Sequence, residues 1–336
     1  MIEPLKFKRI ERNLGLEIHR MLLCFWVLLF HSIRHSDNAV LDYILHLKFH
    51  VPCFFFISFY FFFPIIRDKN IKKMKLRYIR LTVPFIFWPL IIYILNNILF
   101  IHLKKNRFGR MLSFKELYIQ LITGRKFFIQ LWFIFNLLFL STFFYIFMYM
   151  GDYIFIILLD FFLIICYFIQ YSDPNYYFYR QFNDCISHSV GHLIISFPIA
   201  VTAFNMRRID LIKFFGNNIL FLVLLPLIIV ILFIYGTPYT YNGIDKNLFS
   251  SVSFYFFHII PINNFLSNKP KKIIFCITNY TQGIYCMHII IKYYIFRFLN
   301  LTPSFLSCIY LYIICYILSY FGKKIFEKNI LRYLFI

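Results

Sequence analysis

The chain has 336 residues, of which 61% are hydrophobic and only 15% are charged. Apolar runs of about twenty residues recur along its length, and a helix of that length crosses the ~30 Å hydrocarbon core of a bilayer. A soluble fold has no core large enough to bury so many runs, so the sequence predicts a membrane protein that spans the bilayer several times. The net charge of +21 does not indicate a nucleic-acid-binding protein, because lysine and arginine accumulate in cytoplasmic loops of membrane proteins.

Ten transmembrane helices are predicted, in an all-α bundle that forms one membrane-spanning domain over residues 1–336 without a separate soluble domain. Their approximate ranges are 18–36, 48–66, 81–101, 129–149, 152–171, 189–205, 217–235, 248–266, 274–296 and 304–322. An even number of spans places both termini on the same side. The first run follows four basic residues and lacks a small-residue cleavage site, so we expect an uncleaved signal anchor.

The basic residues predict which side the termini face. With both termini in the cytoplasm, the cytoplasmic segments hold 21 of the 35 lysines and arginines. Loop 102–128 is the exception, since it carries seven and would lie outside. Two explanations are open: this loop is an amphipathic surface segment, or one of the neighbouring helices is wrongly assigned.

The first predicted helix carries polar residues within an apolar run. At about 100° per residue, the eleven steps from Arg20 to His31 bring the two side chains within about 20° of each other, separated by about 16 Å along the axis. Glu17 lies one turn before Arg20 and can pair with it. Two interpretations are open. In the first, these side chains form a stripe that lines a polar cavity. In the second, Arg20 extends to the lipid headgroups and His31 lies near the outer interface.

Five motifs in this order resemble acyltransferase family 3, the integral-membrane O-acyltransferases. The first is Leu16-Glu17-Ile18-His19-Arg20, followed by ten residues and His31. Residues 51–60 (VPCFFFISFY) resemble the second-helix FF-x-x-SG, with Phe59 in place of the glycine. Residues 77–85 (RYIRLTVPF) resemble an R-x-x-R stretch, 131–133 (LWF) the start of the fourth helix, and 281–288 (TQGIYCMH) a late GIY-x-x-H helix.

The resemblance implies a multi-pass enzyme of the cell membrane, an O-acetyltransferase that uses cytoplasmic acetyl-CoA or another acyl-CoA. The acceptor would be a hydroxyl of a cell-surface glycan, such as a polysaccharide or lipopolysaccharide, or of a glycolipid. Acyl-CoA is then a substrate, and no permanently bound cofactor is expected. Some members of the family carry an additional esterase-like domain. None is expected in this chain, so the bundle acts alone or passes the acyl group to a separate esterase-like partner.

Four residues are the expected centre of this chemistry. Histidine suits proton transfer near neutral pH, so His31 is expected to act as a general base or as a transient covalent acyl carrier. Arg20 is expected to hold the acyl donor or to polarise its thioester carbonyl, or else to form a structural pair with Glu17. Arg77 and Arg80 lie three residues apart and suit the phosphates of coenzyme A, although the cytoplasmic bias of basic residues explains them equally well.

Further polar and aromatic side chains are candidates for the cavity lining. These are Glu17, Ser58, Trp132, Tyr285 and His288, of which the last two share one helix face. His31 and His35 are spaced like a metal-binding pair, but no third ligand follows at a recognisable spacing, and the eight cysteines form no CxxC. No metal site is predicted.

The alternative to an enzyme is a secondary transporter of a small molecule or a lipid-linked sugar, because a polar stripe among ten helices also suits a carrier. Against it, the sequence shows no inverted repeat, and Asp160 is the clearest acidic residue within a span. A non-catalytic scaffold is a second alternative. The acceptor sugar, the acyl chain and the oligomeric state do not follow from the sequence.

Overall fold

The protein folds as a bundle of helices. The computed structural model describes residues 13–33, 49–103, 110–124, 131–172, 184–209, 243–259, 266–292 and 304–335, with a few single positions between these ranges, and these residues contain no strand. The helices are α1 (Leu14–Ser32), α3 (His50–Arg67), α4 (Ile71–Leu103), α5 (Phe114–Thr123), α6 (Trp132–Met148), α7 (Asp152–Ser172), α9 (Asp184–Ile209), α12 (Gly243–Ile259), α14 (Asn268–Thr278), α15 (Thr281–Ile291), α16 (Phe305–Ile325) and the 3₁₀ helix η3 (Ile330–Leu334).

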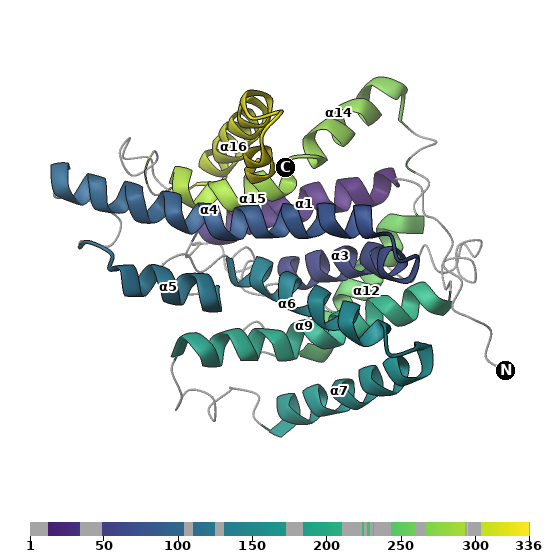
Figure 1. Ribbon diagram of the computed structural model, residues 1–336. Coiled ribbons are helices and arrows are strands. Elements are labelled where there is room, and N and C mark those ends of the chain that lie inside the picture. Colours follow the sequence, from purple (N-terminus) through teal and green to yellow (C-terminus); the bar gives the residue numbers. More distant parts are fainter. Residues whose placement is uncertain are drawn as a thin grey trace.

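The helices lie in layers. Figure 1 shows α15 and α16 above α1 and the long α4, with α3, α6 and α12 below them and α9 and α7 at the opposite side of the bundle. Helix α3 packs against α1, α6, α9 and α12, and is therefore the central helix of the described bundle. The predicted all-α architecture is confirmed for the described residues.

Four described helices are long and apolar enough to cross a membrane, namely α1, α3, α4 and α16, and the bent pair α14–α15 makes a fifth if it is one span. Helix α6 is apolar but shorter, at 17 residues. Many large apolar side chains face outward, such as Ile157, Ile164 and Phe168 of α7, which is the surface expected against lipid. The protein is therefore a membrane protein, while the count of ten spans and the side of the termini stay predictions.

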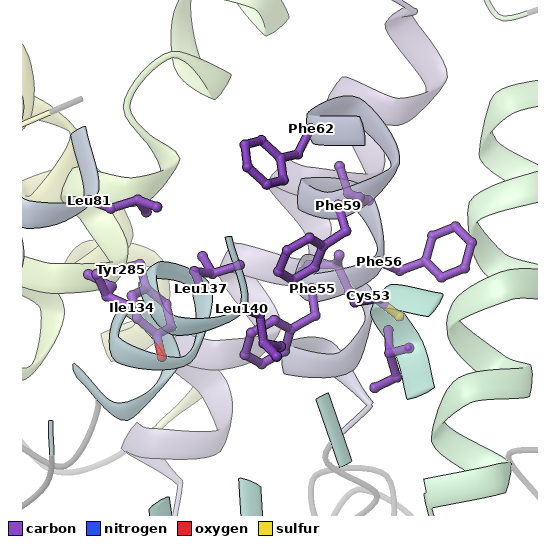
Figure 2. Packing of buried hydrophobic residues seen from close by; sticks show 14 of the residues in the cluster. Cys53, Phe55, Phe56, Phe59, Phe62, Leu81, Ile134, Leu137, Leu140 and Tyr285 are labelled. Carbon is purple, nitrogen blue, oxygen red and sulfur yellow. The ribbon is translucent and has the colours of Figure 1, made fainter. Parts of the chain in front are cut away.

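Phenylalanine rings fill the centre of the bundle. Phe59 and Phe63 of α3 are fully buried and contact Phe144 of α6, with ring centroids 5.4 and 5.2 Å away, and Phe204 of α9 lies 4.9 Å from Phe63. Figure 2 shows Phe55 and Phe59 of α3 beside Leu137 and Leu140, with Phe62 above them. Phe59, which stands where the family motif has glycine, is thus a packing residue between α3 and α6.

The predicted helix 81–101 begins ten residues too late, because α4 begins at Ile71. Only Asp68–Asn70 form a turn, in which Lys69 has a positive φ of 46°. Residues 71–80 contain no glycine or proline, and seven of the ten are lysine, arginine, leucine or methionine, which are good helix formers. Hydropathy detects only the apolar part of α4, whereas the helix already begins at the basic residues that precede this part.

The predicted helix 274–296 is two helices. α14 and α15 are bent by 57° relative to each other across Asn279 and Tyr280. The hydroxyls of Thr278 and Thr281 donate to the carbonyl oxygens of Phe275 and Thr278, so side chains replace backbone hydrogen bonds at the break. Threonine and asparagine compete with helical hydrogen bonding in this way. The start of α15 consequently lies inside the bundle rather than at its surface.

The remaining predicted ranges agree to different degrees with the structure. α3, α6, α7 and α16 lie within three residues, at each end, of the predicted ranges 48–66, 129–149, 152–171 and 304–322. α1 and α12 begin four and five residues earlier than predicted, and α9 extends beyond both ends of range 189–205. Most of range 217–235 lies outside the described residues.

Within loop 102–128 the structure contains an amphipathic helix, α5, as the first of the two explanations requires. Ser113 and Glu116 form a reciprocal capping box, and Gly124 ends the helix with a positive φ of 68°. Its buried residues are Leu117, Gln120 and Thr123, while Phe114, Tyr118 and Ile122 are exposed on one face. An exposed apolar face of this kind suits the lipid interface.

The first turn of α1 is fixed by its contact with the end of α12. The side chain of Asn13 caps α1 by accepting from the N–H of Leu16, and its amide donates to the carbonyl of His258 at 2.9 Å. A Cβ on Gly15 would lie 1.9 Å from the carbonyl oxygen of Phe257, so this approach requires glycine. The contact sets the position of Glu17 and Arg20, which follow within two turns.

One end of the bundle is rich in positive charge, and we call it the basic end. Here α3 ends, α4 begins and α1 and α15 begin, as the connection between α3 and α4 in Figure 1 shows. Its cations include Arg67, Lys72, Lys73 and Lys75. The distribution of basic residues predicts that this end faces the cytoplasm.

Acidification is expected to loosen α5. A hydrogen bond from Arg110 holds the pKa of Glu116 at about 2, below its ordinary value of 4.5. Because the folded pKa is the lower one, the carboxylate contributes stability above about pH 4.5 and loses it as pH falls toward 2. Amide hydrogen exchange of residues 113–124, corrected for the intrinsic pH dependence of exchange, should lose protection over this window. In Glu116→Gln that step should be absent; an identical step in the variant would contradict this role.

Candidate active site

Arg20 is held from two sides at the start of α1. Its Nη1 lies 3.2 Å from Oε2 of Glu17, one turn earlier, and its Nη2 donates to the hydroxyl of Thr281 at 3.2 Å. Glu17 is 7% exposed, so this carboxylate is buried, while its partner Arg20 is half-buried. The predicted Glu17–Arg20 pair is present, and Thr281, the first residue of α15, joins α1 to α15 through the same guanidinium.

Arg77 projects from α4 between α3 and α6. Its Nη2 donates to the hydroxyl of Ser58 at 3.0 Å, and its Nε and Nη2 donate to the hydroxyl of Ser141 at 3.3 and 3.2 Å. The guanidinium carbon lies 4.2 Å from the ring centroid of Phe62 and 5.8 Å from that of Phe59. All of these partners are neutral. Arg77 is thus a partly buried cation that no carboxylate among the described residues neutralises.

Arg80 lies one turn further along α4 and is exposed. Its carbonyl oxygen accepts a hydrogen bond of 2.8 Å from the side chain of Gln282. This bond joins α4 to the first turn of α15, as Arg20 joins α1 to it. The start of α15 is therefore fixed between α1 and α4.

These residues surround a cavity of about 570 Å³, which we call the basic cavity. Its charged lining consists of four cations and one carboxylate: Arg20, Lys73, Arg77, Arg80 and Glu17. Lys73 and Arg80 are exposed, so the lining reaches the surface at the basic end. Its polar and apolar lining consists of Asn13, Leu16, Phe54, Ile57, Ser58, Phe61, Ile65, Leu76, Leu81, Phe133, Ile134, Leu137, Thr281, Gln282 and Tyr285.

Three aromatic rings stand together at the inner part of this lining, and we call them the ring cluster. They come from Phe54 of α3, Phe133 of α6 and Tyr285 of α15. The ring of Tyr285 lies 6.4 Å from that of Phe54 and 5.4 Å from that of Phe133, and the two phenylalanine rings are 6.2 Å apart. In Figure 2, Tyr285 lies beside Ile134 with Leu81 above them.

Two histidines meet beyond the ring cluster, and neither belongs to the cavity lining. His31, in the last turn of α1, lies with its ring centroid 5.3 Å from that of His288. His288 is fully buried, and its ring lies 5.9 Å from the ring of Tyr285, which does line the cavity. Lys292 donates to the backbone carbonyl oxygen of His31. Tyr285 is thus in contact with both the basic cavity and the histidine pair.

The structure brings most of the predicted site residues into two neighbouring places. Glu17, Arg20, Ser58, Arg77, Arg80 and Tyr285 line the basic cavity, and His31 and His288 form the pair beyond it. Trp132 lies elsewhere, stacked on His192 with ring centroids 3.7 Å apart. His35 lies outside the described residues, and the described residues contain no group of three or more metal-ligating side chains.

Several residues of the site were not predicted from the sequence. Ser141 lies in the apolar helix α6 with no exposed surface, and Thr281 and Gln282 begin the motif of which Tyr285 and His288 were selected. Lys292 interrupts the apolar end of α15. A polar residue within an apolar run is the signal that distinguishes Ser141 and Lys292, because such a residue needs a partner inside a membrane protein.

The family model described as an acyltransferase domain, that of acyltransferase family 3, matches residues 13–322 of the chain. The match covers every element that builds the basic cavity and the histidine pair. Neither a curated protein nor a solved structure matches the chain. Since the family model covers far more than half of the sequence and the helices suit a bilayer, the chain belongs to acyltransferase family 3 and is a membrane-bound transferase of acyl groups.

Proposed function

We propose that the protein is an O-acyltransferase of the cell membrane that moves an acetyl group from cytoplasmic acetyl-CoA to a hydroxyl of a cell-surface glycan or glycolipid. The observation that carries this proposal is the charge of the basic cavity, where the hydrogen-bond partners of Arg77 among the described residues are all neutral. A cation taken partly out of water is costly unless an opposite charge compensates it. An anionic substrate provides that charge when it is bound.

The phosphates of coenzyme A fit the mouth of this cavity. Arg80 and Lys73 are exposed there, and arginine binds phosphate oxygens with two parallel hydrogen bonds. The first turn of α15, which begins at Thr281, lies in the same lining, and a helix N-terminus favours anions. The cations of α4 and the start of α15 therefore favour a ligand with several negative charges at one end.

The rest of the lining suits the uncharged arm of the donor. Leu16, Ile57 and Ile134 are apolar and buried, and the three rings of the ring cluster belong to the same lining. An acyl-CoA has its phosphates at one end and its thioester at the other, which matches a cavity that is basic outside and apolar inside. To reach His31, the thioester must pass the ring cluster, which favours a short acyl group, and we therefore propose acetyl-CoA as the donor.

The acceptor is proposed to enter from the opposite end of the bundle, where α1 ends and His31 lies. As a general base, His31 takes the proton of the acceptor hydroxyl while its oxygen attacks the thioester carbonyl. The carbon–sulfur bond then breaks, and the coenzyme A thiolate receives the proton from the imidazolium. As a covalent carrier, a ring nitrogen of His31 instead attacks the thioester carbonyl, the carbon–sulfur bond breaks and coenzyme A leaves as the thiolate. In a second step the acceptor hydroxyl attacks the acyl group, the bond from the acyl carbon to the ring nitrogen breaks, and the hydroxyl proton passes through that nitrogen to the thiolate.

Arg20 is proposed to anchor the donor rather than to polarise the thioester. It lies eleven residues from His31 on the same helix, about 16 Å along the axis, and it contacts Thr281 at the basic end. A group that far from His31 cannot hydrogen-bond an oxyanion that forms beside the His31 ring. The two residues therefore serve opposite ends of the same extended donor.

A pair of substitutions on α4 tests the donor site. Arg80→Ala should raise the KM for acetyl-CoA roughly tenfold, as expected for the loss of one charge-assisted hydrogen bond, with little change in kcat. Lys75→Ala removes a positive charge from the same helix at an exposed position outside the cavity lining, and should leave the KM unchanged. Initial rates of acetyl transfer in membranes measure both. If both substitutions changed the KM equally, the cations of α4 would not form a donor site, and the cytoplasmic bias of basic residues would explain them.

Labelled transfer tests the reaction itself. Membranes that contain the protein, incubated with acetyl-labelled acetyl-CoA, should transfer label to the glycan or glycolipid fraction, and His31→Ala should abolish the transfer because it removes the reacting imidazole. His192→Ala is the matched control, since His192 stacks on Trp132 outside the cavity lining and should keep the label. Without any label, in membranes where each variant is inserted and several acyl-CoAs are tried, a transporter would replace the enzyme.

A further inference from the structure

His288 is held in one tautomer by the backbone of its own helix. Its Nδ1 lies 2.6 Å from the carbonyl oxygen of Tyr285. A carbonyl oxygen only accepts hydrogen bonds, so Nδ1 carries the proton of this bond. In the neutral ring the lone pair then lies on Nε2, which accepts a hydrogen bond and cannot donate one. His288 thus presents an acceptor on the side of the ring remote from the Tyr285 carbonyl.

The Nε2 atom of His288 is buried and has no hydrogen-bond partner among the described residues. The mechanism outlined above gives this atom no role. Buried polar atoms are nearly always hydrogen-bonded, and exceptions are concentrated at functional sites. The atom therefore calls for a donor within reach of the ring.

His31 is such a donor. Its ring centroid lies 5.3 Å from that of His288, with 31° between the ring planes. Two imidazole rings joined by an N–H···N bond of about 3 Å have centres about 5 Å apart, because each nitrogen lies about 1.1 Å from its ring centre. The observed separation is slightly longer than this. Catalytic hydrogen bonds are often long without substrate and shorten when it binds.

We propose that His288 is a positioning residue for His31: Nε2 of His288 accepts a hydrogen bond from one ring nitrogen of His31. This bond fixes the His31 tautomer and leaves the lone pair of its second nitrogen for the substrates. The inference rests on the proposed function, and it applies to His31 as a base and as a carrier alike. A third group that orients the base is the arrangement of catalytic triads, with a histidine here in the place of the carboxylate.

The protons balance without a change at His288. When His31 takes the proton of the acceptor hydroxyl, both of its ring nitrogens carry hydrogen, and the bond to Nε2 of His288 stabilises that imidazolium. The proton leaves with the coenzyme A thiolate, and His31 returns to its first tautomer. The hydrogen bond from His288 to the Tyr285 carbonyl is kept throughout.

Lys292 fixes the relative position of the two helices at this place. It directly follows α15, one turn beyond His288, and donates to the backbone carbonyl oxygen of His31 at the end of α1. The same two helices are joined at the basic end through Arg20 and Thr281. With contacts at both ends, α1 and α15 hold the two histidine rings in a fixed register.

Two substitutions of His288 separate positioning from packing. Asparagine places an amide N–H near the position of Nδ1, so it can keep the bond to Tyr285, but it has no acceptor at the position of Nε2. Glutamine reaches that position with its amide oxygen and can accept from His31. His288→Asn should lower kcat for acetyl transfer about 100-fold with an unchanged KM for acetyl-CoA. His288→Gln should keep kcat within about tenfold of the unchanged protein.

Unchanged kcat in His288→Asn would overturn the proposal, as would equal losses in the asparagine and glutamine variants. A raised KM with unchanged kcat would also overturn it, because the residue would then act on donor binding. If His288→Asn is not recovered in the membrane, the proposal is tested with His288→Gln alone, by the rate at which His31 is chemically modified.

A second measurement does not depend on acyl transfer. Diethyl pyrocarbonate carbethoxylates an imidazole nitrogen that carries a lone pair, and peptide mass spectrometry follows the rate at His31. His288→Asn should slow this reaction several-fold and His288→Gln should preserve it. An unchanged carbethoxylation rate of His31 in the His288→Asn variant, or a slowed rate in the His288→Gln variant, would overturn the proposal. If no sample transfers label to the glycan but the modification rate of His31 depends on His288, the proposed function is rejected. The proposed hydrogen bond between His31 and His288 is then kept.

Discussion

The basic cavity depends on the guanidinium of Arg77, which no carboxylate in the described part of the chain neutralises. Arg77 is held between α3, α4 and α6 by the hydroxyls of Ser58 and Ser141 and lies against the ring of Phe62. These contacts involve the N–H groups of Nε and Nη2 and orient the guanidinium, but they bring no negative charge to it. The charge is therefore available to a ligand, and the three helices are joined at the place where that ligand would bind.

The second organising element is α15, whose start lies inside the bundle because the chain bends between α14 and α15. From this start, Thr281 contacts Arg20 and Gln282 contacts the carbonyl of Arg80. One turn later Tyr285 contributes a ring to the ring cluster, and its carbonyl holds His288. A single helix thus connects the cations of the basic cavity with the histidine pair, and the ring cluster separates the two.

Much of this arrangement follows from sequence, but its decisive contacts do not. The apolar runs predict the central helices because hydrophobicity over about twenty residues is a strong signal. The spacing of Glu17 and Arg20 predicts their pairing because it is local to one helix. The contact of His31 with His288 joins residues 257 positions apart, and it depends on the packing of α1 against α15, which neither helix specifies alone. The start of α4 and the break after α14 were mispredicted, because hydropathy does not register a basic helical turn or a short bend.

The central claim is that the basic cavity binds the phosphate end of coenzyme A, and equilibrium binding tests it most directly. Purified protein in detergent is titrated with acetyl-labelled acetyl-CoA, which is then competed with coenzyme A, dephospho-coenzyme A and pantetheine. Coenzyme A should compete best, dephospho-coenzyme A less well and pantetheine least. Dephospho-coenzyme A has fewer phosphates than coenzyme A for the cations to bind, and pantetheine has none. Competition by pantetheine equal to that by coenzyme A, or no saturable binding of acetyl-CoA, would contradict the account.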